Sequence, residues 1–408
     1  MSIESLLELD RIAKAKGRSL AGRRVLFDVL RADQGRHFIG IAGPRGAGKT
    51  ILLQQLAAQQ EDSCYLSLDT LAAGTDLFEL LKSLSERYAF HTFYLDEVHF
   101  LSDGLGSLKK IFDFLEVRIV FTSSVALRMQ ASAHDLARRM RLYVLDYFTF
   151  REYLHFFHKI ELPGLSVDDF LAGRIDPAYL RVDGYWPRYA TGGLMPFGLE
   201  EPEPLPLLRA TIETIITRDI PATLRLHLDE LDTLRRMITF VGRSGVDGIN
   251  YSSLSNNLGI TKYKAEQYVQ AFQDAFLFIR LFPHGTNLLR EPKILLMPPL
   301  RCLYRPSDQV RGGLREDFVA LSMRQAGIAL NYLKGTRGQK TPDFHFKHDG
   351  ASVVLEVGGK GKGRSQFKGA RADRKIVLGE SSPMRADQRP LHLLGFLKCV
   401  DDSELSPV

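Results

Sequence analysis

Residues 43–50 have the composition and spacing of a phosphate-binding loop. Glycines in such a loop let the backbone bend with its N–H groups pointing inward, so that a nucleotide β-phosphate is held at a helix N-terminus. Lys49 is expected to reach the β- and γ-phosphates, and Thr50 to ligate Mg²⁺. The pattern predicts binding of ATP with Mg²⁺, and the residues expected to form the nucleotide site are Gly43, Pro44, Arg45, Gly46, Ala47, Gly48, Lys49, Thr50 and Ile51.

A second chemical signal is the apolar run 93–95, which is followed by two carboxylates. We expect Asp96 to hold Mg²⁺ through water, and Glu97 to position and deprotonate the attacking water. Alone, the pair would fit equally well a strand that ends in two solvated acids. Together with the upstream loop, it predicts nucleotide hydrolysis.

The elements around these residues alternate between strand-like and helical patterns. Strands are expected at 39–42, 64–68, 93–95, 117–122 and 143–145, and helices at 49–58, 76–88, 108–115 and 126–140, after a helical region that extends to about residue 36. This alternation predicts an α/β fold: the mostly parallel sheet of a P-loop NTPase with helices on both faces. The arrangement suits an NTPase in which another strand lies between the phosphate-loop strand and the acid strand.

The length and composition of the chain limit its class. A chain of 408 residues predicts two or three domains, and 45% hydrophobic with 25% charged residues is ordinary for a globular protein. We find neither an apolar run of membrane-spanning length nor a signal-peptide pattern, and the three cysteines lack metal-type spacing, so a cytoplasmic protein without a membrane partner is expected. The net charge of +6 is modest evidence for a polyanionic partner.

Four segments are expected: an ATPase core (1–148), a helical connector (149–225), a winged helix (226–300) and a small α+β domain (301–408). The winged helix is predicted from helical patterns at 231–241, 251–258 and 263–275, followed by strand-like runs at 277–282 and 293–297. Winged helices bind DNA or dock proteins, and Glu266 weakens the basic face, so both partners stay open. The side chains suited to phosphates and base edges are Thr261, Lys262, Lys264, Gln267 and Gln270.

Three acids near the end of the chain have the order of a nuclease metal site. Glu316 lies on a predicted helix, Asp343 begins a strand and Glu356 lies in the next strand. Nuclease sites of this kind place a lysine two residues after the last acid, where this chain has Gly358. A metal at these acids is therefore expected only if the site is intact, and the domain is expected to be inactive. The basic residues from Lys360 onward fit a phosphate-contacting surface or a solvated loop.

The phosphate loop, the acids within 95–99 and the segments 121–124, 136–139 and 148–153 together resemble the AAA_14 type of AAA+-like ATPases. The Gly192-Gly193 turn, residues 217–220 and the acid-bearing end are similar to a DUF4143 C-terminal region. The resemblance implies an ATPase core joined to a winged helix and a restriction-endonuclease-like domain.

The resemblance also implies roles for individual polar residues. Arg139 matches an arginine that contacts the γ-phosphate from its own chain or from a neighbouring copy, which would require a homo-oligomer, and Arg138 is the alternative. Ser123 stands where the family usually has glycine, which leaves Thr122 or Ser124 as a polar sensor of the γ-phosphate. A hydroxyl at this position fits a helix cap equally well.

The leading hypothesis is an ATP-hydrolysing switch or motor that engages DNA through its C-terminal half. One alternative is a signalling or scaffold NTPase whose nucleotide state controls the docking of a protein. The other is a nuclease regulated by ATP.

Overall fold

The computed structural model describes residues 2–33, 35–72, 74–101, 104–123, 139–224, 226–227, 229–245, 249–285, 291–333, 341–358, 367, 371–380 and 384–398. These residues form two compact units, one up to Tyr147 and one from Phe148. The further division of the second unit at residues 225 and 300 stays a prediction.

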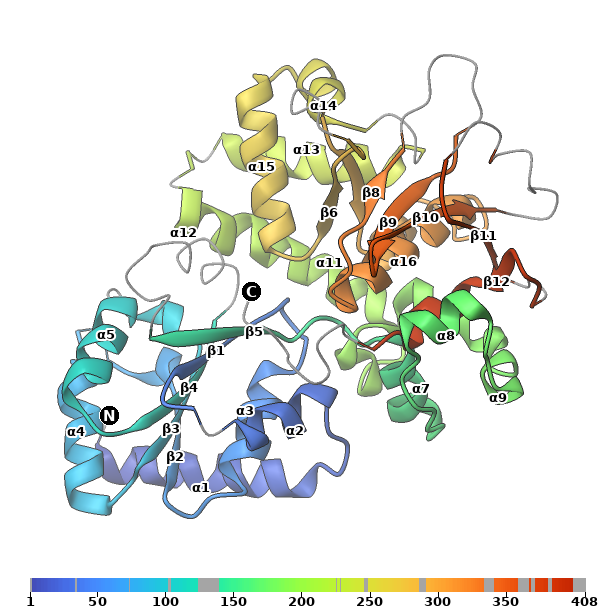
Figure 1. Cartoon of the computed structure of the whole chain (residues 1–408). Helices are drawn as coiled ribbons and strands as arrows, with labels where there is room; N and C mark the ends of the chain where they lie inside the picture. Colours follow the sequence, from blue (N-terminus) through green and yellow to red (C-terminus); the bar gives the residue numbers. More distant parts are fainter. Residues whose placement is uncertain are drawn as a thin grey trace. The chain divides into compact units, whose positions relative to one another are not determined.

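The first unit is built on a parallel sheet (Figure 1). In its described residues the strand order is β2-β3-β4-β1-β5, so β4 lies between the strand that precedes the phosphate loop, β1, and the acid strand, β3. All neighbouring pairs are parallel. The strands are β1 (Phe38–Ala42), β2 (Ser63–Ser67), β3 (Thr92–Asp96), β4 (Arg118–Ser123) and β5 (Met140–Val144). The predicted α/β sheet, including the intervening strand, is confirmed.

Helices cover both faces of this sheet, as Figure 1 shows. One apolar cluster joins α4 and α5 to strand residues such as Phe93 and Phe121. A second cluster joins α2 and α3 to residues of the other parity, such as Tyr94 and Val120. Alternating side chains of one strand point to opposite faces, so strands covered on both sides are apolar throughout. The helices are α1 (Ile3–Ser19), α2 (Val25–Ala32), α3 (Lys49–Ala57), α4 (Leu77–Tyr88) and α5 (Gly104–Phe114).

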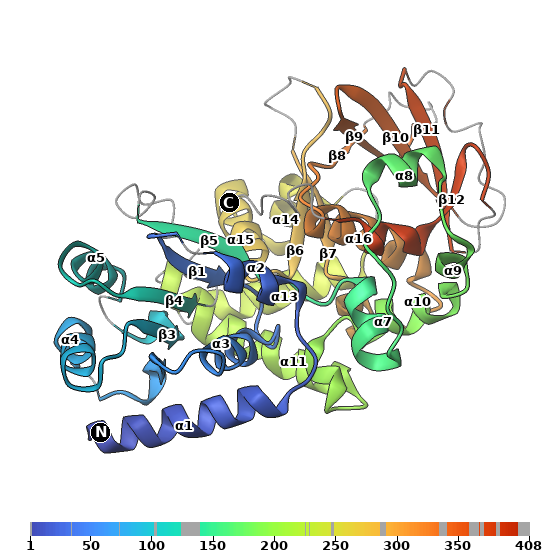
Figure 2. The same ribbon diagram turned by 60° about the horizontal axis from the view of Figure 1, so that its bottom comes forward.

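The first helix packs along α3 and the edge strand β2 (Figure 2). Asp10, buried on α1, accepts a hydrogen bond from the backbone N–H of Tyr65 at 2.7 Å and pairs with Lys14 at 3.1 Å. The amino-terminal helical region is therefore tied to the strand that runs beside the acid strand.

One predicted boundary in this unit is wrong. The helix expected at 126–140 was extended to Met140, but β5 begins at Met140, which pairs with Phe38 of β1. Pairing with a central strand decides the conformation of this residue, and residues 126–138 lie outside the described part of the chain.

The second unit begins with helices and short helical turns. These are α7 (Phe150–His158), α8 (Val167–Ala172), α9 (Pro177–Leu180), α10 (Trp186–Arg188), a π-helical turn (Tyr189–Gly193), α11 (Pro204–Thr214), a second π-helical turn (Ile215–Asp219) and α12 (Ile220–Leu224). Thr149 and Glu152 form a reciprocal capping box at the start of α7. Pro204 is the first residue of α11, a position at which proline's missing N–H is tolerated.

A helical module with an antiparallel ribbon follows. It contains α13 (Glu230–Arg243), α14 (Tyr251–Leu258), α15 (Lys262–Asp274), β6 (Phe278–Leu281) and β7 (Lys293–Leu296), and β6 pairs antiparallel with β7. Thr261 caps α15 by accepting a hydrogen bond from the N–H of Lys264.

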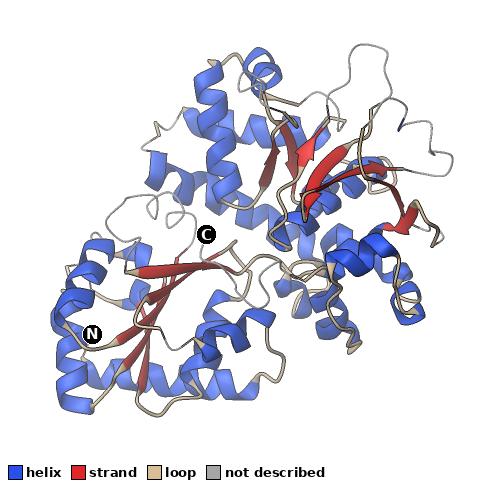
Figure 3. Ribbon diagram, viewed as in Figure 1, coloured by secondary structure: helices blue, strands red, loops and turns tan. Residues whose placement is uncertain are grey.

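The last elements form a mixed sheet, drawn in red with the other strands in Figure 3. In the described residues its order is β12-β11-β10-β9-β8, and α16 (Arg311–Gln325) precedes it along the chain. The strands are β8 (Asn331–Tyr332), β9 (Phe344–His348), β10 (Ala351–Val357), β11 (Arg374–Gly379) and β12 (Gln388–Pro390), and short 3₁₀ helices occupy η7 (Pro298–Leu303) and η9 (Leu391–Phe396). A buried ion pair between Arg301 of η7 and Asp317 of α16 joins these elements.

In the described part of both units, every helix is too short or too polar to cross a bilayer.

Candidate functional site

The phosphate loop connects the end of β1 to the start of α3, as expected. Gly46 and Gly48 adopt left-handed backbone conformations, with φ of 76° and 89°, which favour glycine. Gly43 lies so close to β5 that a Cβ atom would approach the carbonyl oxygen of Leu145 to 2.1 Å. A Cβ at Gly48 would meet no atom within 4 Å. Glycine is therefore favoured at 46 and 48 by the backbone conformation and at 43 by the lack of space for a side chain. With these glycines the backbone can curve around a ligand.

Lys49 is buried over the loop that it follows. Its Nζ donates hydrogen bonds to the carbonyl oxygens of Gly43 at 2.8 Å and Pro44 at 3.0 Å. The ammonium group is thus held against the loop carbonyls, and the oxygens of a bound phosphate would compete for its hydrogen bonds. Its predicted role in phosphate binding fits this placement.

The two acids lie at the carboxyl edge of the same sheet. Asp96 is the last residue of β3 and only 2% exposed, and Ser123 at the end of β4 is paired with Ala42 at the end of β1. Because the strands are parallel, their carboxyl ends meet at one edge, next to the loop. The Thr122 hydroxyl donates to Asp96 Oδ1, and the Tyr65 hydroxyl donates to Asp96 Oδ2 at 3.0 Å.

Burial raises the pKa of Asp96 above its ordinary value, whereas hydrogen bonds from Thr122, Thr50 and Tyr65 oppose the rise. The contact between Thr50 and Asp96 brings together the two residues predicted to serve Mg²⁺. A hydroxyl and a carboxylate are hard oxygen donors, and Mg²⁺ in nucleotide sites is held by few protein ligands together with water and phosphate oxygens. The residues present therefore fit Mg²⁺ with a bound triphosphate.

Glu97 has an unusual backbone conformation. Its φ of 59° and ψ of 51° are left-handed, and its N–H donates to Thr122 Oγ1 at 2.9 Å. Such a conformation costs about 1–3 kcal/mol in a residue other than glycine and is concentrated at functional sites. The left-handed turn at Glu97 ends β3 directly after Asp96.

The hydroxyl residues at the end of β4 have separate places. Thr122 is fully buried, and its hydroxyl donates a hydrogen bond to Asp96 and accepts one from the backbone N–H of Glu97. The hydroxyl proton is therefore engaged by Asp96, and the role of Thr122 as a γ-phosphate sensor stays a prediction. Ser123 is also buried. Ser124, proposed as a sensor, and Arg138, proposed as an arginine finger, lie outside the described residues.

Arg139 lies at the other edge of the sheet. Its carbonyl oxygen accepts from the N–H of Phe38, the first residue of β1, whereas the phosphate loop follows the last, about 16 Å away for a five-residue strand at 3.3 Å per residue. Its side chain donates to both carboxylate oxygens of Asp113, at 2.9 and 3.1 Å. The structure does not bring Arg139 to the loop of its own chain, and contact from a neighbouring copy stays a proposal.

Two residues that sequence analysis missed support this site. Tyr65 bonds Asp96 from the neighbouring strand, and burial, followed by the Asp96 charge, raises the pKa of Tyr65 above its ordinary value. Arg24, buried before α2, donates to the carbonyl oxygens of Ala47 at 2.7 Å and Asp146 at 2.8 Å, and so ties the loop to the end of β5. No local motif marks either residue, because their partners are distant in sequence.

The three acids of the expected nuclease-like site are only partly brought together. The antiparallel register of β9 and β10 places Glu356 opposite Asp343, and Asp343 accepts a hydrogen bond from the N–H of Val357 at 2.7 Å. Glu316 instead pairs with Lys293 at 2.7 Å. In the described part of the chain, the three carboxylates do not form a group within 4.8 Å of one another. A metal at these acids, which was expected only if the site is intact, stays a prediction.

The basic residues expected to face DNA on α15 have acidic partners. Lys262 pairs with Glu291 at 2.5 Å, and Lys264 pairs with Glu230 at 2.8 Å. The hydrogen bond from Lys264, followed by that from Tyr268, lowers the pKa of Glu230 to about 2. The positive charge predicted from the sequence is therefore largely compensated at this helix.

Comparisons with known proteins agree with the first unit and correct one expectation for the second. Residues 35–154 match the AAA domain family AAA_14. Residues 184–297 match a domain of unknown function, DUF8612, in place of the DUF4143 region that the resemblance suggested. The DUF4143 assignment is therefore not supported.

Similar proteins were also found along most of the chain. The uncharacterized protein MJ1637 of Methanocaldococcus jannaschii is 26% identical, over 92% of this chain and 89% of that protein. Among solved structures, the Walker-type ATPase PABY2304 of Pyrococcus abyssi is 13% identical with a TM-score of 0.40, over 71% of this chain and 94% of that one. The S. cerevisiae Hsp104-ADP complex is 13% identical with a TM-score of 0.32, over 78% of this chain and 44% of that one. The AAA match includes the phosphate loop and the paired acids, so residues 35–154 resemble an AAA-like P-loop ATPase domain.

Proposed function

We propose that this protein hydrolyses ATP in the presence of Mg²⁺ and uses the nucleotide cycle as a switch or motor that engages DNA through its second unit. The observation that carries the ATPase proposal is the gathering of Asp96 and Glu97, through Thr122, at the sheet edge from which the phosphate loop starts. The phosphate loop is about 50 residues from Asp96 along the chain, and Thr122 is about 25 residues from Asp96. The pairing of β1, β4 and β3 brings the ends of these strands to one edge.

Each residue has a distinct role in this proposal. Lys49 exchanges its hydrogen bonds to the loop carbonyls for the β- and γ-phosphates. Thr50, and Asp96 through water, hold Mg²⁺, which supplies positive charge against the transferring phosphoryl group. Glu97 orients a water molecule and accepts its proton.

Substitution of Lys49 and Glu97 tests the proposal. Lys49→Ala should abolish ATP binding in calorimetry. Glu97→Gln should keep binding and lower turnover by about 10²–10⁴-fold, the usual contribution of a general base. Exposed residues of the same type, Lys16 on α1 and Glu86 on α4, provide matched controls that should keep wild-type activity. Full turnover by Glu97→Gln would overturn the role given to Glu97.

The order of α13, α14, α15 and the β6–β7 ribbon supports a winged helix in the second unit, and the net charge of +6 supports a polyanionic partner. ATP turnover should therefore rise when DNA is added. The measurement is turnover with duplex, branched and single-stranded DNA. Equal rates with and without every DNA, together with weak binding that does not change with salt, would remove DNA as the partner.

A signalling or scaffold NTPase is the second candidate, and the charge pairing on α15 favours it. Because Lys262 and Lys264 are matched by Glu291 and Glu230, the exposed face of α15 is closer to neutral than a DNA-reading helix usually is. In this case the module would dock a protein in one nucleotide state. Nucleotide-dependent capture of a defined protein, insensitive to salt, would favour this function over DNA engagement.

A further inference from the structure

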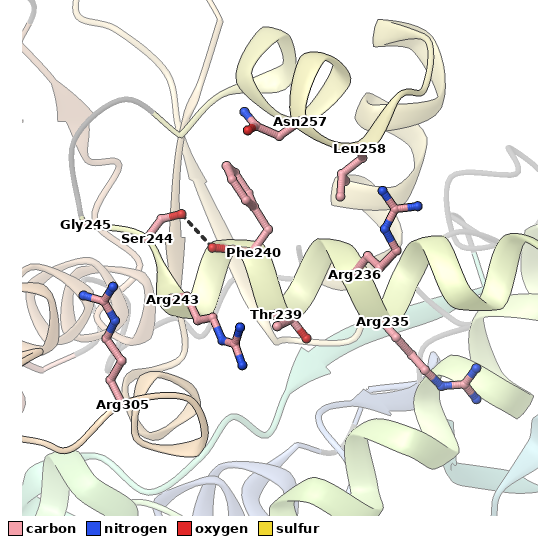
Figure 4. A pocket seen from close by; sticks show the side chains of 10 residues that line it. All are labelled: Arg235, Arg236, Thr239, Phe240, Arg243, Ser244, Gly245, Asn257, Leu258 and Arg305. Carbon is pink, nitrogen blue, oxygen red and sulfur yellow. Dashed lines mark hydrogen bonds between the residues drawn. The ribbon is translucent and has the colours of Figure 1, made fainter.

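An arginine-lined groove of about 720 Å³ lies along the second half of α13 (Figure 4). We call it the arginine groove. α13, α14 and the segment after η7 all contribute to its wall, and the residues that matter for its chemistry are Arg235, Arg236, Phe240, Arg243, Asn257 and Arg305. It is separate from α15, where the sequence predicted DNA contact.

Most of the positive charge in the arginine groove is uncompensated. Arg235 is paired with Glu213. For Arg236, Arg243 and Arg305, no described residue forms a salt bridge, and all three are exposed. Like charges that converge on a concave surface repel one another and attract anions to it. The groove therefore differs from α15, whose lysines both have carboxylate partners.

The arginine groove is held in place by buried contacts. Arg301, paired with the buried Asp317, donates to the carbonyl oxygen of Ser244 at 3.1 Å, which fixes the end of α13. A Cβ at Gly242 would lie 2.2 Å from the Tyr304 ring, so the absence of a side chain at Gly242 lets Tyr304 pack on α13. This contact places the next residue, Arg305, beside the end of the helix. The groove is thus preformed, which lowers the entropy cost of binding.

The side chains of the arginine groove are suited to a nucleic-acid strand. Arg236 and Arg243 are seven residues apart and stem from one face of α13, separated by about 10.5 Å along the axis, so both can contact phosphates of one strand that runs along the helix. Phe240 lies between them and is half-buried, and Figure 4 shows its ring directed toward Asn257 of α14. An aromatic ring beside backbone-binding arginines is suited to stack on an unpaired base.

We propose that the arginine groove binds single-stranded DNA, with Arg236, Arg243 and Arg305 contacting phosphates and Phe240 stacking on a base. Paired bases of a duplex are already stacked and inaccessible to Phe240, which favours the single strand. This inference deepens the proposed engagement of DNA and rests on it. The proposed DNA contact therefore lies on the face formed by α13 and α14, whereas the sequence predicted a contact on α15.

The test uses the full-length protein and fluorescence anisotropy with a labelled oligothymidine. Wild-type affinity should fall by about 20-fold between 50 and 200 mM salt from three phosphate contacts alone, at a slope of about 0.7 per contact for a single strand. The triple variant Arg236→Ala, Arg243→Ala, Arg305→Ala should decrease the slope of log K against log salt by about 2.1. The matched control, Lys262→Ala with Lys264→Ala, should keep the wild-type slope.

Two further variants separate the proposed contacts from a loss of folding. Lysine at the same three positions keeps the charge and should restore the slope, and basal ATP turnover without DNA should equal that of the wild type in every variant. Phe240→Leu should weaken binding of oligothymidine by about 5- to 150-fold, with an unchanged salt slope and unchanged affinity for duplex.

The outcomes distinguish this inference from the proposed function. If the wild type binds DNA and the triple alanine variant binds with the same affinity and slope, the arginine groove is not the site, and DNA engagement survives. A larger loss in the Lys262 and Lys264 control than in the triple variant would also reject the groove. If the wild type binds neither single strand nor duplex, DNA engagement itself fails and the groove inference fails with it.

Discussion

Replacing Thr122 by valine tests whether one buried hydroxyl organises both acids of the candidate ATPase site. Valine has nearly the shape of threonine, so the substitution removes two hydrogen bonds without creating a large cavity. The hydroxyl donates to Asp96 Oδ1 and accepts from the N–H of Glu97 at 2.9 Å, and its side chain is inaccessible to solvent. The variant therefore affects the orientation of Asp96 and the left-handed turn at Glu97 together.

The expected loss of stability follows from these two bonds. A hydrogen bond to a charged group contributes about 1.5–3 kcal/mol, and a buried N–H left without a partner costs about 1–3 kcal/mol, which gives about 2.5–6 kcal/mol in total. For a unit of this size, 1 kcal/mol corresponds to about 2–4 °C in melting temperature, so the first unit should melt at least about 5 °C lower.

The pH dependence of turnover gives a second readout. Burial already raises the pKa of Asp96, and the Thr122 hydrogen bond opposes that rise. Without the hydroxyl the pKa rises further, so the neutral acid, which binds Mg²⁺ poorly, persists to higher pH. The acidic limb of the turnover profile should therefore move to higher pH, and more Mg²⁺ should be needed for half-maximal turnover.

The assay compares melting temperature and the pH profile of ATP turnover for wild type, Thr122→Val and Thr122→Ser. Serine retains the hydroxyl and should behave much like the wild type. A valine variant with wild-type stability and an unshifted acidic limb would refute the reasoning, because neither bond would then matter to the acids.

Three further predictions concern other contacts. Lys49→Met, which keeps the apolar stem, should lower ATP affinity by about 10²–10⁴-fold, as expected for two charge-assisted hydrogen bonds at about 1.5–3 kcal/mol each, and near-wild-type affinity in calorimetry would contradict this. If Arg139 acts on a neighbouring copy, specific ATPase activity should rise with protein concentration, and Arg139→Ala should remove that rise; a flat wild-type profile excludes the role. The Glu230 pKa, lowered to about 2, implies stability that is present above the ordinary glutamate pKa near 4.3 and is lost as pH falls toward 2. Melting temperature should therefore fall more steeply between pH 5 and pH 3 in the wild type than in Glu230→Gln, and parallel curves would reject the linkage.

The sequence was informative wherever a few neighbouring residues determine both conformation and chemistry. The glycines at 46 and 48 and the following lysine and threonine indicate a tight loop before a helix, and this loop is present. The caps at Asn250 and Thr261 follow the same local rule at the starts of α14 and α15, because Asn and Thr favour this position.

Predictions failed or remained open where the deciding partner is distant in the chain. Met140 was assigned to a helix, but pairing with Phe38 places it in a strand. The lysines at 262 and 264 suggested a basic face, yet their acidic partners are Glu230 of α13 and Glu291, which lies two residues before β7. A count of basic residues along the sequence does not predict which of them form ion pairs with distant acids.

The sequence by itself determined the nucleotide-binding loop, the acid strand and the alternation of strands and helices, because spacing along the chain sets backbone conformation and the face that each side chain occupies. Tertiary structure decided which hydroxyl serves the acids, which arginine supports the loop and where positive charge stays uncompensated. These features depend on pairs such as Tyr65 with Asp96, Arg24 with Ala47 and Arg235 with Glu213, which only the folded packing of strands and helices brings within hydrogen-bonding distance.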